Sequence, residues 1–479
     1  MQKAPQSAKV IVIGAGPAGL AAAARLCELG CPPTVVEASS RVGGMAGSLN
    51  LWGHTVDLGP HRFFSSDPVV VAFWQSYVAT DYVMVSRQTR IFYRGRFFDY
   101  PLNAGNALRN LGLSRALSAV SSYVKAQIKP EPDDGSLESW VSNRFGRFLF
   151  NTFFRTYTEK LWGISCRQLD SDWAAQRIQG LTLGNAITSA LRGNRGNKLK
   201  TLVDEFAYPE SGNQLFYDRM CEAVNETDEG RVLLNSPVKQ VSISDGRVDA
   251  VVLANGDRIE AEWIVSSMPI TLLLKALPDV PTAVLEAATK LRFRHTILVY
   301  LLIDEENLFS DQWLYIHDTS VLHGRITNFR NWSSGIVGDD GRTVLCIEYW
   351  CFDEDPIWTS SEEDLVDLAS SEVLSVGLIP SGSVVSGKVI RVPRCYPVYE
   401  RGYADPLKIV TDYLDGIEGL APIGRYGAFK YNNQDHSLLM GIMAAESIRA
   451  GHKPNLWHVN TDSVYQEEAA SKLLSVIDQ

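Results

Sequence analysis

A glycine-rich turn between a short strand and an alanine-rich helix constrains the fold of this chain more than any other feature. Residues 9–13, KVIVI, form a β-branched run that is followed directly by G-A-G-P-A-G. The stretch LAAAARLCELG comes next and ends at Gly30, where a helix needs its C-cap. The three glycines of the turn are Gly14, Gly16 and Gly19.

This turn has the chemistry of a dinucleotide site. The glycines allow a tight turn, a close approach of the backbone and close helix packing, so that a pyrophosphate sits on the helix N-terminus. A second strand at residues 34–36 closes on Glu37, in register to accept hydrogen bonds from an adenosine ribose. The unit therefore predicts a dinucleotide-binding domain; the alternative is a glycine-rich turn in an unrelated α/β fold.

Composition excludes several classes of protein. The 479 residues are 45% hydrophobic and 21% charged, and 45 basic against 55 acidic side chains give a net charge of −10. This is globular composition, long enough for two or three domains, and it excludes disordered and fibrous chains. The negative charge and the lack of a Lys/Arg run argue against nucleic acid or a membrane as the main partner, while local basic sites for an anionic substrate stay compatible.

The cysteines and the apolar runs indicate a cytoplasmic protein. The seven cysteines are scattered and never spaced C-x-x-C, so neither a disulfide framework nor a zinc site is indicated. The longest clean apolar run, residues 297–303, is far shorter than the ~20 residues of a membrane span. The N-terminus passes from a short polar tail into a strand, so we expect an unprocessed, soluble protein.

The middle of the chain changes its hydrophobic period twice. Residues 104–205 favour helices, and Ser136 suits the N-cap of one of them. Residues 231–268 alternate around two hairpin dipeptides, Asp-Gly and Asn-Gly, and predict a three-stranded meander. Strand candidates between residues 290 and 400 predict a second sheet, followed by a helix at about 435–450 that Asp435 could cap.

The residues after Glu37 extend the nucleotide signature. The motif E-x-x-x-R-x-G-G, ending at Gly44, resembles the flavoprotein family of amine oxidases, protoporphyrinogen oxidase and UDP-galactopyranose mutase. The resemblance implies FAD as the cofactor. Arg41 can then meet the second phosphate, although a surface ion pair is the alternative. The residues assigned to FAD are Gly14, Gly16, Ala18, Gly19, Glu37, Ala38, Arg41, Gly43, Gly44, Met45, Gly59, His61, Val238, Arg425, Gln434 and Ser437.

Two segments resemble the nucleotide-sugar site of UDP-galactopyranose mutases. Y-T-E-K-L-W-G supplies Tyr157 and Trp162, with Arg177 fifteen residues further on. The second segment places Tyr315 and Arg325 ten residues apart. Two arginines from distant parts of the chain could neutralise a departing diphosphate. The alternatives are a core aromatic for Trp162 and a surface salt bridge for Arg177.

Three further motifs match the same family. G-R-Y-G-A-F-K-Y-N-N-Q-D-H-S assigns Tyr431 and Asn433 to the substrate, although mutases of bacteria usually carry aspartate where Asn433 falls. D-L-G-P-H-R places His61 against the flavin, and the alternative is a loop histidine without catalytic duty. Tyr403 is matched to another tyrosine that contacts phosphate. His317 and His323 lie near the second segment, but their spacing indicates no metal, and we interpret both as structural or exposed.

The resemblance implies an α/β fold with a Rossmann-type FAD-binding domain, an inserted helical domain and a second, antiparallel sheet domain. We expect the FAD-binding domain at residues 1–100, 205–275 and 405–479, the helical domain at 101–204 and the sheet domain at 276–404. The last helix would direct its N-terminus at the flavin ring.

The implied activity is that of a nucleotide-sugar mutase. Such an isomerase interconverts pyranose and furanose forms of a UDP-galactopyranose-like substrate by attack of the reduced flavin N5 on the anomeric carbon, without net oxidation. NADPH or NADH can serve as the reductant. The proposed catalytic residues are Arg177, Arg325, Trp162, His61 and Tyr431, and the substrate-binding residues are Tyr157, Tyr315, Tyr403 and Asn433. The alternatives are an oxidoreductase of the amine oxidase or protoporphyrinogen oxidase type and a flavin-bound nucleotide-sugar binding protein without turnover.

Overall fold

The computed structural model describes residues 8–100, 102, 104–171 and 205–459. Its centre is a parallel five-stranded sheet, ordered β19-β13-β1-β2-β9. The strands are β1 (Val10–Ile13), β2 (Thr34–Val36), β9 (Arg231–Leu233), β13 (Trp263–Ser266) and β19 (Leu420–Pro422). This is the predicted Rossmann-type core.

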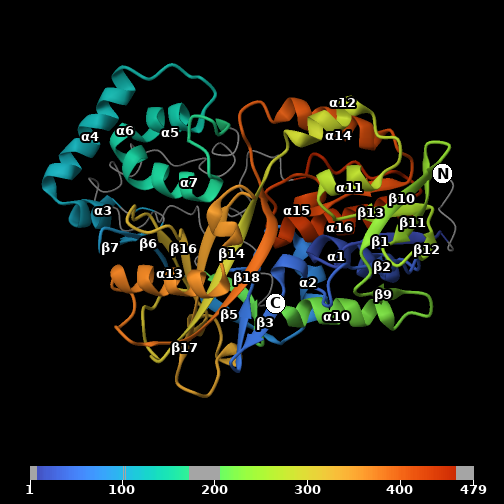
Figure 1. Ribbon diagram of the computed structural model, residues 1–479, viewed down its shortest axis with the longest axis horizontal. Coiled ribbons are helices and arrows are strands. Elements are labelled where there is room, and N and C mark those ends of the chain that lie inside the picture. Colours follow the sequence, from blue (N-terminus) through green and yellow to red (C-terminus); the bar gives the residue numbers. More distant parts are fainter. Residues whose placement is uncertain (1–7, 101, 103, 172–204, 460–479) are drawn as a thin grey trace.

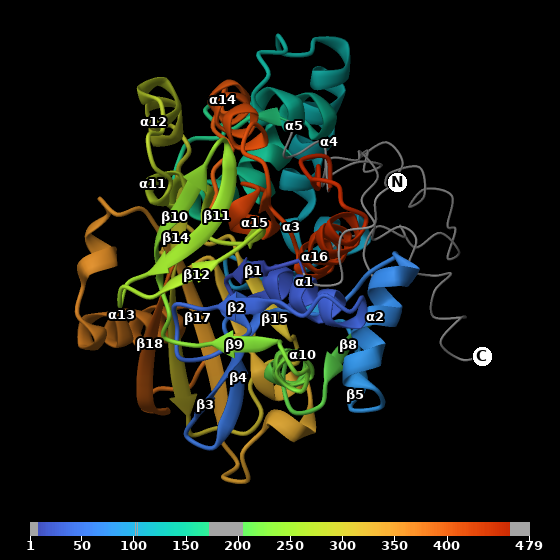
Figure 2. The same ribbon diagram turned by 90° about the vertical axis from the view of Figure 1, so that its right-hand side faces the viewer.

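Four helices pack around this sheet (Figures 1 and 2). They are α1 (Pro17–Glu28), α2 (Pro68–Val78), α10 (Gln214–Asn225) and α16 (Gln434–Arg449). Helices α1 and α16 approach closely at Gly441. An added Cβ there would lie 2.3 Å from the Ala18 carbonyl oxygen. The alanines of α1 are buried at this contact, which explains the alanine-rich sequence after the glycine turn.

The meander is shorter than the sequence predicts. Its three antiparallel strands are β10 (Val238–Ser244), β11 (Arg247–Leu253) and β12 (Arg258–Glu260). The flanking β9 and β13, which the alternation pattern joined to it, belong to the central sheet instead. Pro237, which has no N–H to donate, and Asn235, at φ +52°, separate β9 from β10. Helices α11 (Ile270–Ala276), α12 (Thr282–Thr289) and α14 (Ala404–Asp415) pack beside this meander.

The second sheet has seven strands, ordered β18-β14-β17-β16-β15-β6-β7. All pairs are antiparallel except β15 with β6. The strands are β6 (Thr89–Tyr93), β7 (Arg96–Asp99), β14 (Phe293–Ile303), β15 (Trp313–Ile316), β16 (Arg325–Asn328), β17 (Thr343–Cys351) and β18 (Val384–Pro397). β6 and β7 therefore extend the sheet of the other domain, although we expected them with the FAD-binding residues. Helix α13 (Glu362–Ser375) covers one face (Figure 1).

A helical layer lies beyond the β6 and β7 edge of this sheet (Figure 1). It contains α3 (Ala104–Leu111), α4 (Leu113–Ile128), α5 (Leu137–Phe145), α6 (Arg147–Leu149) and α7 (Arg155–Trp162). The Ser136 hydroxyl accepts from the Ser139 N–H at 3.1 Å, which confirms the predicted N-cap. The rest of the predicted helical region, residues 172–204, lies outside the described residues.

Short elements connect these layers. There are two antiparallel strand pairs: the hairpin of β3 (Ser48–Leu51) with β4 (His54–Asp57), and the long-range pair of β5 (Tyr82–Ser86) with β8 (Glu205–Pro209). The single turn α15 (Gly424–Gly427) precedes α16. The last helix begins one residue earlier than predicted, and its N-cap is Asn433 instead of Asp435. In the described part of the chain, none of the helices has the length and apolar character needed to cross a bilayer.

Candidate functional site

A cavity of about 590 Å³ runs from the glycine turn of α1 to the face of the seven-stranded sheet. Its wall brings together residues from almost the whole length of the described chain. The predicted site residues that line it are Gly14, Gly16, Ala18, Glu37, Ala38, Gly44, Met45, His61, Val238, Tyr315, Arg325, Arg425, Tyr431, Asn433, Gln434 and Ser437.

The turn before α1 has the geometry that a pyrophosphate needs. Gly14 adopts φ +95°, which favours glycine, and an added Cβ there would lie 2.3 Å from the Ser267 hydroxyl. An added Cβ at Gly19 would lie 1.9 Å from the Gly14 carbonyl oxygen, so only glycine lets the helix pack on the turn. No side chain caps the N-terminus of α1, which leaves its first N–H groups to a ligand.

Glu37 lies at the carboxyl end of β2, in the wall of the cavity. Its Oε2 accepts from the Ala15 N–H at 2.7 Å and its Oε1 accepts from the Ser39 N–H at 2.8 Å. These bonds fix the carboxylate beside the glycine turn. Val238 lines the same end of the cavity at the start of β10, and its place against the adenine stays a prediction of the resemblance.

The N-terminus of α16 forms the other end of the cavity. The Gln434 amide accepts from the Tyr217 hydroxyl at 2.6 Å and donates to the His61 carbonyl at 3.2 Å. Arg425 donates through Nε and Nη2 to the Asn432 carbonyl, at 2.8 and 2.5 Å. A helix N-terminus and a guanidinium at this place favour negative charge on a bound ring system.

His61 is held neutral at this end of the cavity. Burial and the nearby charges of Arg425 and Arg325 lower the pKa of its imidazole to about 3. Its carbonyl also accepts from the Asn213 amide at 2.5 Å, and the same amide donates to the fully buried Asp57 carboxylate at 2.7 Å. His61 is therefore positioned by its backbone and carries no charge at neutral pH.

Two neighbouring strands of the second sheet, β15 and β16, line the cavity where it meets the sheet. Tyr315 of β15 and Arg325 of β16 face each other across the strand pair, and both line the cavity. Arg325 donates through Nε and Nη2 to the two oxygens of Glu348, each at 2.6 Å. Burial lowers the pKa of Arg325, and the charge of Glu348 raises it. The net effect holds the pKa well above its usual range.

Three predicted substrate residues lie behind the cavity wall. Trp162 is fully buried, and its ring lies 5.8 Å from that of Tyr431. Tyr157 packs edge-on against Tyr315, at 5.3 Å between ring centroids. Tyr403 stacks on Tyr399 at 4.8 Å. Their aromatic rings buttress the wall, which matches the core interpretation of Trp162.

Four predicted cofactor residues also lie off the cavity wall, and one of them is Gly19, which packs on the turn as described above. The Arg41 guanidinium donates to the Ser48 carbonyl at 3.0 Å. Gly43 packs closely on Gly47 and Tyr217, and Gly59 lies just before His61. Arg177, predicted as the other half of the diphosphate clamp, lies outside the described residues.

Sequence reasoning missed Glu348, Arg62 and Trp313. Glu348 is the one charged residue in β17, whose nine residues are all buried, and a carboxylate in such a run signals a buried partner. Arg62 follows His61 directly, and its guanidinium lies 6.0 Å from the Trp313 ring. Arg62 and Trp313 both line the cavity.

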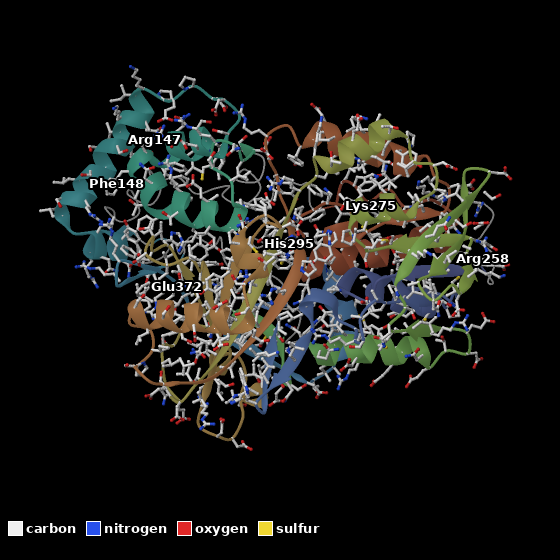
Figure 3. All side chains as sticks on the ribbon, in the orientation of Figure 1. Arg147, Phe148, Arg258, Lys275, His295 and Glu372 are labelled. Atoms are coloured by element: carbon white, nitrogen blue, oxygen red, sulfur yellow. The ribbon has the colours of Figure 1, made fainter. Side chains whose placement is uncertain are left out.

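The two histidines near Arg325 are structural. His317 is buried and stacks on Tyr157, with ring centroids 5.1 Å apart. His323 donates through Nδ1 to Glu372 at 2.7 Å, and Glu372 also accepts from the Tyr349 hydroxyl at 3.0 Å. Figure 3 shows Glu372 among the side chains on the α13 side of the sheet.

The fold and the cavity define a flavoprotein with a Rossmann-type FAD site. The uncapped α1 N-terminus, the glycine turn and the ordered Glu37 carboxylate fit the diphosphate and the adenosine, and the α16 N-terminus fits the ring. The model of the family "Flavin containing amine oxidoreductase" matches residues 17–377. The chain belongs to this family, and FAD is its cofactor.

Curated relatives include carotenoid enzymes. A 15-cis-phytoene desaturase of Arabidopsis thaliana is 27% identical over 316 residues, which are 58% of this chain and 51% of the relative. A 4,4'-diapophytoene desaturase of Staphylococcus aureus (strain Newman) is 39% identical over 95 residues, 19% of this chain and 18% of the relative. The match thus spans about half the length of the phytoene desaturase.

Solved structures share the fold over nearly the full chain. Reduced UDP-galactopyranose mutase has a TM-score of 0.81 at 22% identity, covering 92% of this chain and 94% of that one. A putative protoporphyrinogen oxidase from Exiguobacterium sp. 255-15 has a TM-score of 0.72 at 18% identity, covering 93% and 99%. Putrescine oxidase bound to putrescine has a TM-score of 0.64 at 17% identity, covering 92% and 99%.

Proposed function

We propose that this flavoprotein is an isomerase that interconverts pyranose and furanose forms of a nucleotide-diphosphate sugar. The observation that carries the proposal is the polar substrate side of the FAD cavity, where Tyr315, Arg325 and Tyr431 meet. A guanidinium and phenol hydroxyls suit a diphosphate and a sugar. A polyene substrate would offer no hydrogen bond to these polar groups, so its burial against them is unfavourable.

Glu348 gives Arg325 one orientation. It takes the Nε and Nη2 edge of the guanidinium, and no hydrogen bond of Nη1 is found among the described residues. A fork fixed in this way donates to a leaving diphosphate without reorganising, which is the source of electrostatic stabilisation in such a site. The neighbouring Tyr315 hydroxyl adds a second donor from the facing strand.

The proposed isomerisation does not require a side chain among the described residues to act as a general base. His61 is neutral, because the pKa of its imidazole is about 3. The reduced flavin supplies the nucleophile when it is bound. The work of the chain is then to hold the nucleotide in place while the sugar ring opens and recloses, so that the diphosphate returns to the same carbon.

A titration of the flavin spectrum tests the recognition step. UDP should perturb the absorbance of the bound flavin, and Arg325→Ala should weaken UDP binding while FAD content stays unchanged. Arg330→Ala is the matched control, since Arg330 lies in the 3-10 turn that follows β16 and donates to the Arg342 carbonyl at 2.9 Å. Equal UDP affinity in Arg325→Ala and the unaltered protein would remove the observation on which the proposal rests.

An oxidoreductase of the amine oxidase or protoporphyrinogen oxidase type is the second candidate. It is favoured by the family to which the chain belongs and by the Arg325–Glu348 pair, which has no net charge. It predicts that an organic substrate reduces the flavin under anaerobic conditions without any nucleotide. Flavin bleaching by an amine, a porphyrinogen or a polyene would favour this candidate.

A further inference from the structure

Helix α4 lies on the outer edge of the helical layer (Figure 1), and its exposed side carries an apolar face. Its buried side contributes Ala116 and Ala119, and the helix packs on α3, α5 and α6. The apolar side chains of the exposed face recur every three or four residues, so they lie in one stripe along the helix. The stripe consists of Leu113, Leu117, Val120, Val124 and Ile128, which are 80%, 63%, 41%, 46% and 79% exposed.

A second cavity, of about 350 Å³, lies at the N-terminal end of the same helix. Arg94 of the β6–β7 turn, Arg96 at the start of β7 and Arg115 of α4 line it, together with Gly112. None of these three guanidinium groups forms an ion pair within the described ranges of the chain. Arg96 donates to the Asn110 carbonyl at 2.6 Å, and only the backbone N–H of Arg94 reaches a carboxylate.

The backbone of α4 adds to this positive potential. Gly112 is the N-cap and has no side chain to accept from the first-turn N–H groups. The partial positive charge of a 16-residue helix therefore points toward the cavity that the arginines line. The acidic groups that follow α4 are engaged elsewhere, because Glu131 pairs with Arg147 and Asp134 pairs with Arg401.

The two features adjoin, since Gly112 lines the cavity and Leu113 begins the stripe. The geometry points to an anionic phospholipid membrane as their common partner: the arginine pocket binds the phosphate headgroup, and the apolar stripe of α4 inserts into the same surface. An interfacial helix binds a membrane in this way: basic side chains hold the phosphate groups, and neighbouring apolar side chains insert into the lipid. This inference does not depend on the proposed function.

A second copy of the chain fits the stripe less well. The exposed parts of the five side chains amount to roughly 400–550 Å² of apolar surface. A standard interface buries about 800 Å² on each partner. The sequence predicts no membrane partner because its net charge is negative and it has no Lys/Arg run. Neither property describes a local basic patch whose arginines are brought together by folding.

Sedimentation with vesicles tests the proposal on the FAD-loaded protein. Vesicles of phosphatidylcholine with phosphatidylglycerol should carry the protein into the pellet, and vesicles of phosphatidylcholine alone should carry much less. The pocket variant R94Q/R96Q should partition about 30-fold more weakly, at about fivefold for each arginine. The stripe variant L117S/V124S should lose at least tenfold.

The controls carry matched changes on other faces. Arg258→Gln removes an exposed arginine. Figure 3 labels Arg258 and Arg147 at opposite ends of the molecule. Ile409→Ser changes an apolar side chain on α14 that is 47% exposed. Both should sediment as the unaltered protein does. FAD content and the thermal midpoint of every variant establish that it is folded.

Four results would overturn the proposal. The first is a protein that stays in the supernatant with phosphatidylglycerol vesicles. The second is membrane binding that the stripe variant keeps in full. The third is stabilisation by inorganic phosphate through the pocket arginines without any vesicle binding, which would make free phosphate the ligand. The fourth is a dimer without lipid that L117S/V124S dissociates, which would make a second copy the partner.

Discussion

Glu348 accepts two hydrogen bonds of 2.6 Å from the guanidinium of Arg325, which faces it from the neighbouring strand of the sheet. The pair is almost fully buried beside the FAD cavity, with side-chain exposures of 15% for Arg325 and 1% for Glu348. Its geometry gives the guanidinium one orientation at the wall of the cavity.

Breaking this pair should destabilise the protein strongly. Glu348→Ala leaves a buried guanidinium without its counter-ion, so the free energy of unfolding should fall by about 3–5 kcal/mol. The double variant R325M/E348L should lose less than Glu348→Ala alone, because it leaves no unpaired charge. Urea unfolding followed by flavin fluorescence measures both, and a double variant less stable than the single would contradict the pairing argument.

Arg325→Lys should separate charge from geometry. The lysine keeps the positive charge but loses the fork that Glu348 orients, so kcat/KM for a nucleotide sugar should fall 100- to 1000-fold, or about 2.7–4 kcal/mol. Arg330→Lys, in the 3-10 turn that follows β16, should change kcat/KM by less than twofold. Full turnover in Arg325→Lys would show that a point charge is sufficient.

Gly19→Ala should abolish FAD binding. The new Cβ would lie 1.9 Å from the Gly14 carbonyl oxygen, so the turn that holds the pyrophosphate must move. Gly30→Ala is the matched control, because Gly30 has φ +72° but no atom within 4 Å of an added Cβ, and about 1–2 kcal/mol of backbone strain is its whole cost. The flavin-to-protein absorbance ratio measures both, and a yellow Gly19→Ala protein would contradict the assignment.

Asp57 should make stability depend on pH. Burial raises the pKa of its carboxyl to about 7 from an ordinary value of 3.8, against the opposing bonds from Ser48, Tyr208 and Asn213. Between these two pKa values the folded state holds a proton that the unfolded state releases. The contribution of Asp57 to the free energy of unfolding is therefore fully present below about pH 4 and is lost as pH rises toward 7.

Asp57→Asn tests this directly, because the amide stays uncharged at every pH. The difference in unfolding free energy between Asp57→Asn and the unaltered protein should change across pH 4 to 7 by up to roughly 1.4 kcal/mol per unit. A difference that stays constant with pH would show that Asp57 titrates normally.

His61 should contribute no ionisation to the pH profile of turnover. Its imidazole has a pKa of about 3, so it stays neutral from pH 5 to 8. The profiles of the unaltered protein and of His61→Gln should then have the same shape, whatever their heights. A limb near pH 6.5 that His61→Gln removes would assign the histidine an acid–base role.

The glycine turn and its strands could be predicted because the signal is local. Gly14, Gly19 and the run into Glu37 fix their own conformations through positive φ and close packing, so the sequence alone places them. The family resemblance then gathered Tyr315, Arg325 and Tyr431 correctly into one cavity. The strands near 297, 343 and 384 were predicted from apolar runs and confirmed.

The remaining features depend on contacts that no local pattern contains. Alternation alone cannot tell that β9 pairs with β2 and not with β10, because both pairings satisfy the same pattern. Whether Trp162 faces a cavity or packs behind Tyr431 depends on the position of α7 against the sheet. The same holds for Arg325, whose partner Glu348 lies 23 residues further along the chain.

Turnover of a nucleotide sugar tests the central claim most directly. The FAD-loaded protein is reduced with dithionite under anaerobic conditions and incubated with UDP-galactopyranose and a panel of other nucleotide sugars, and products are separated by chromatography. The account predicts a new isomer of unchanged mass, formed only with reduced flavin and about 100- to 1000-fold more slowly by Arg325→Lys. No isomer from any nucleotide sugar, together with flavin reduction by an amine, a porphyrinogen or a polyene, would contradict it.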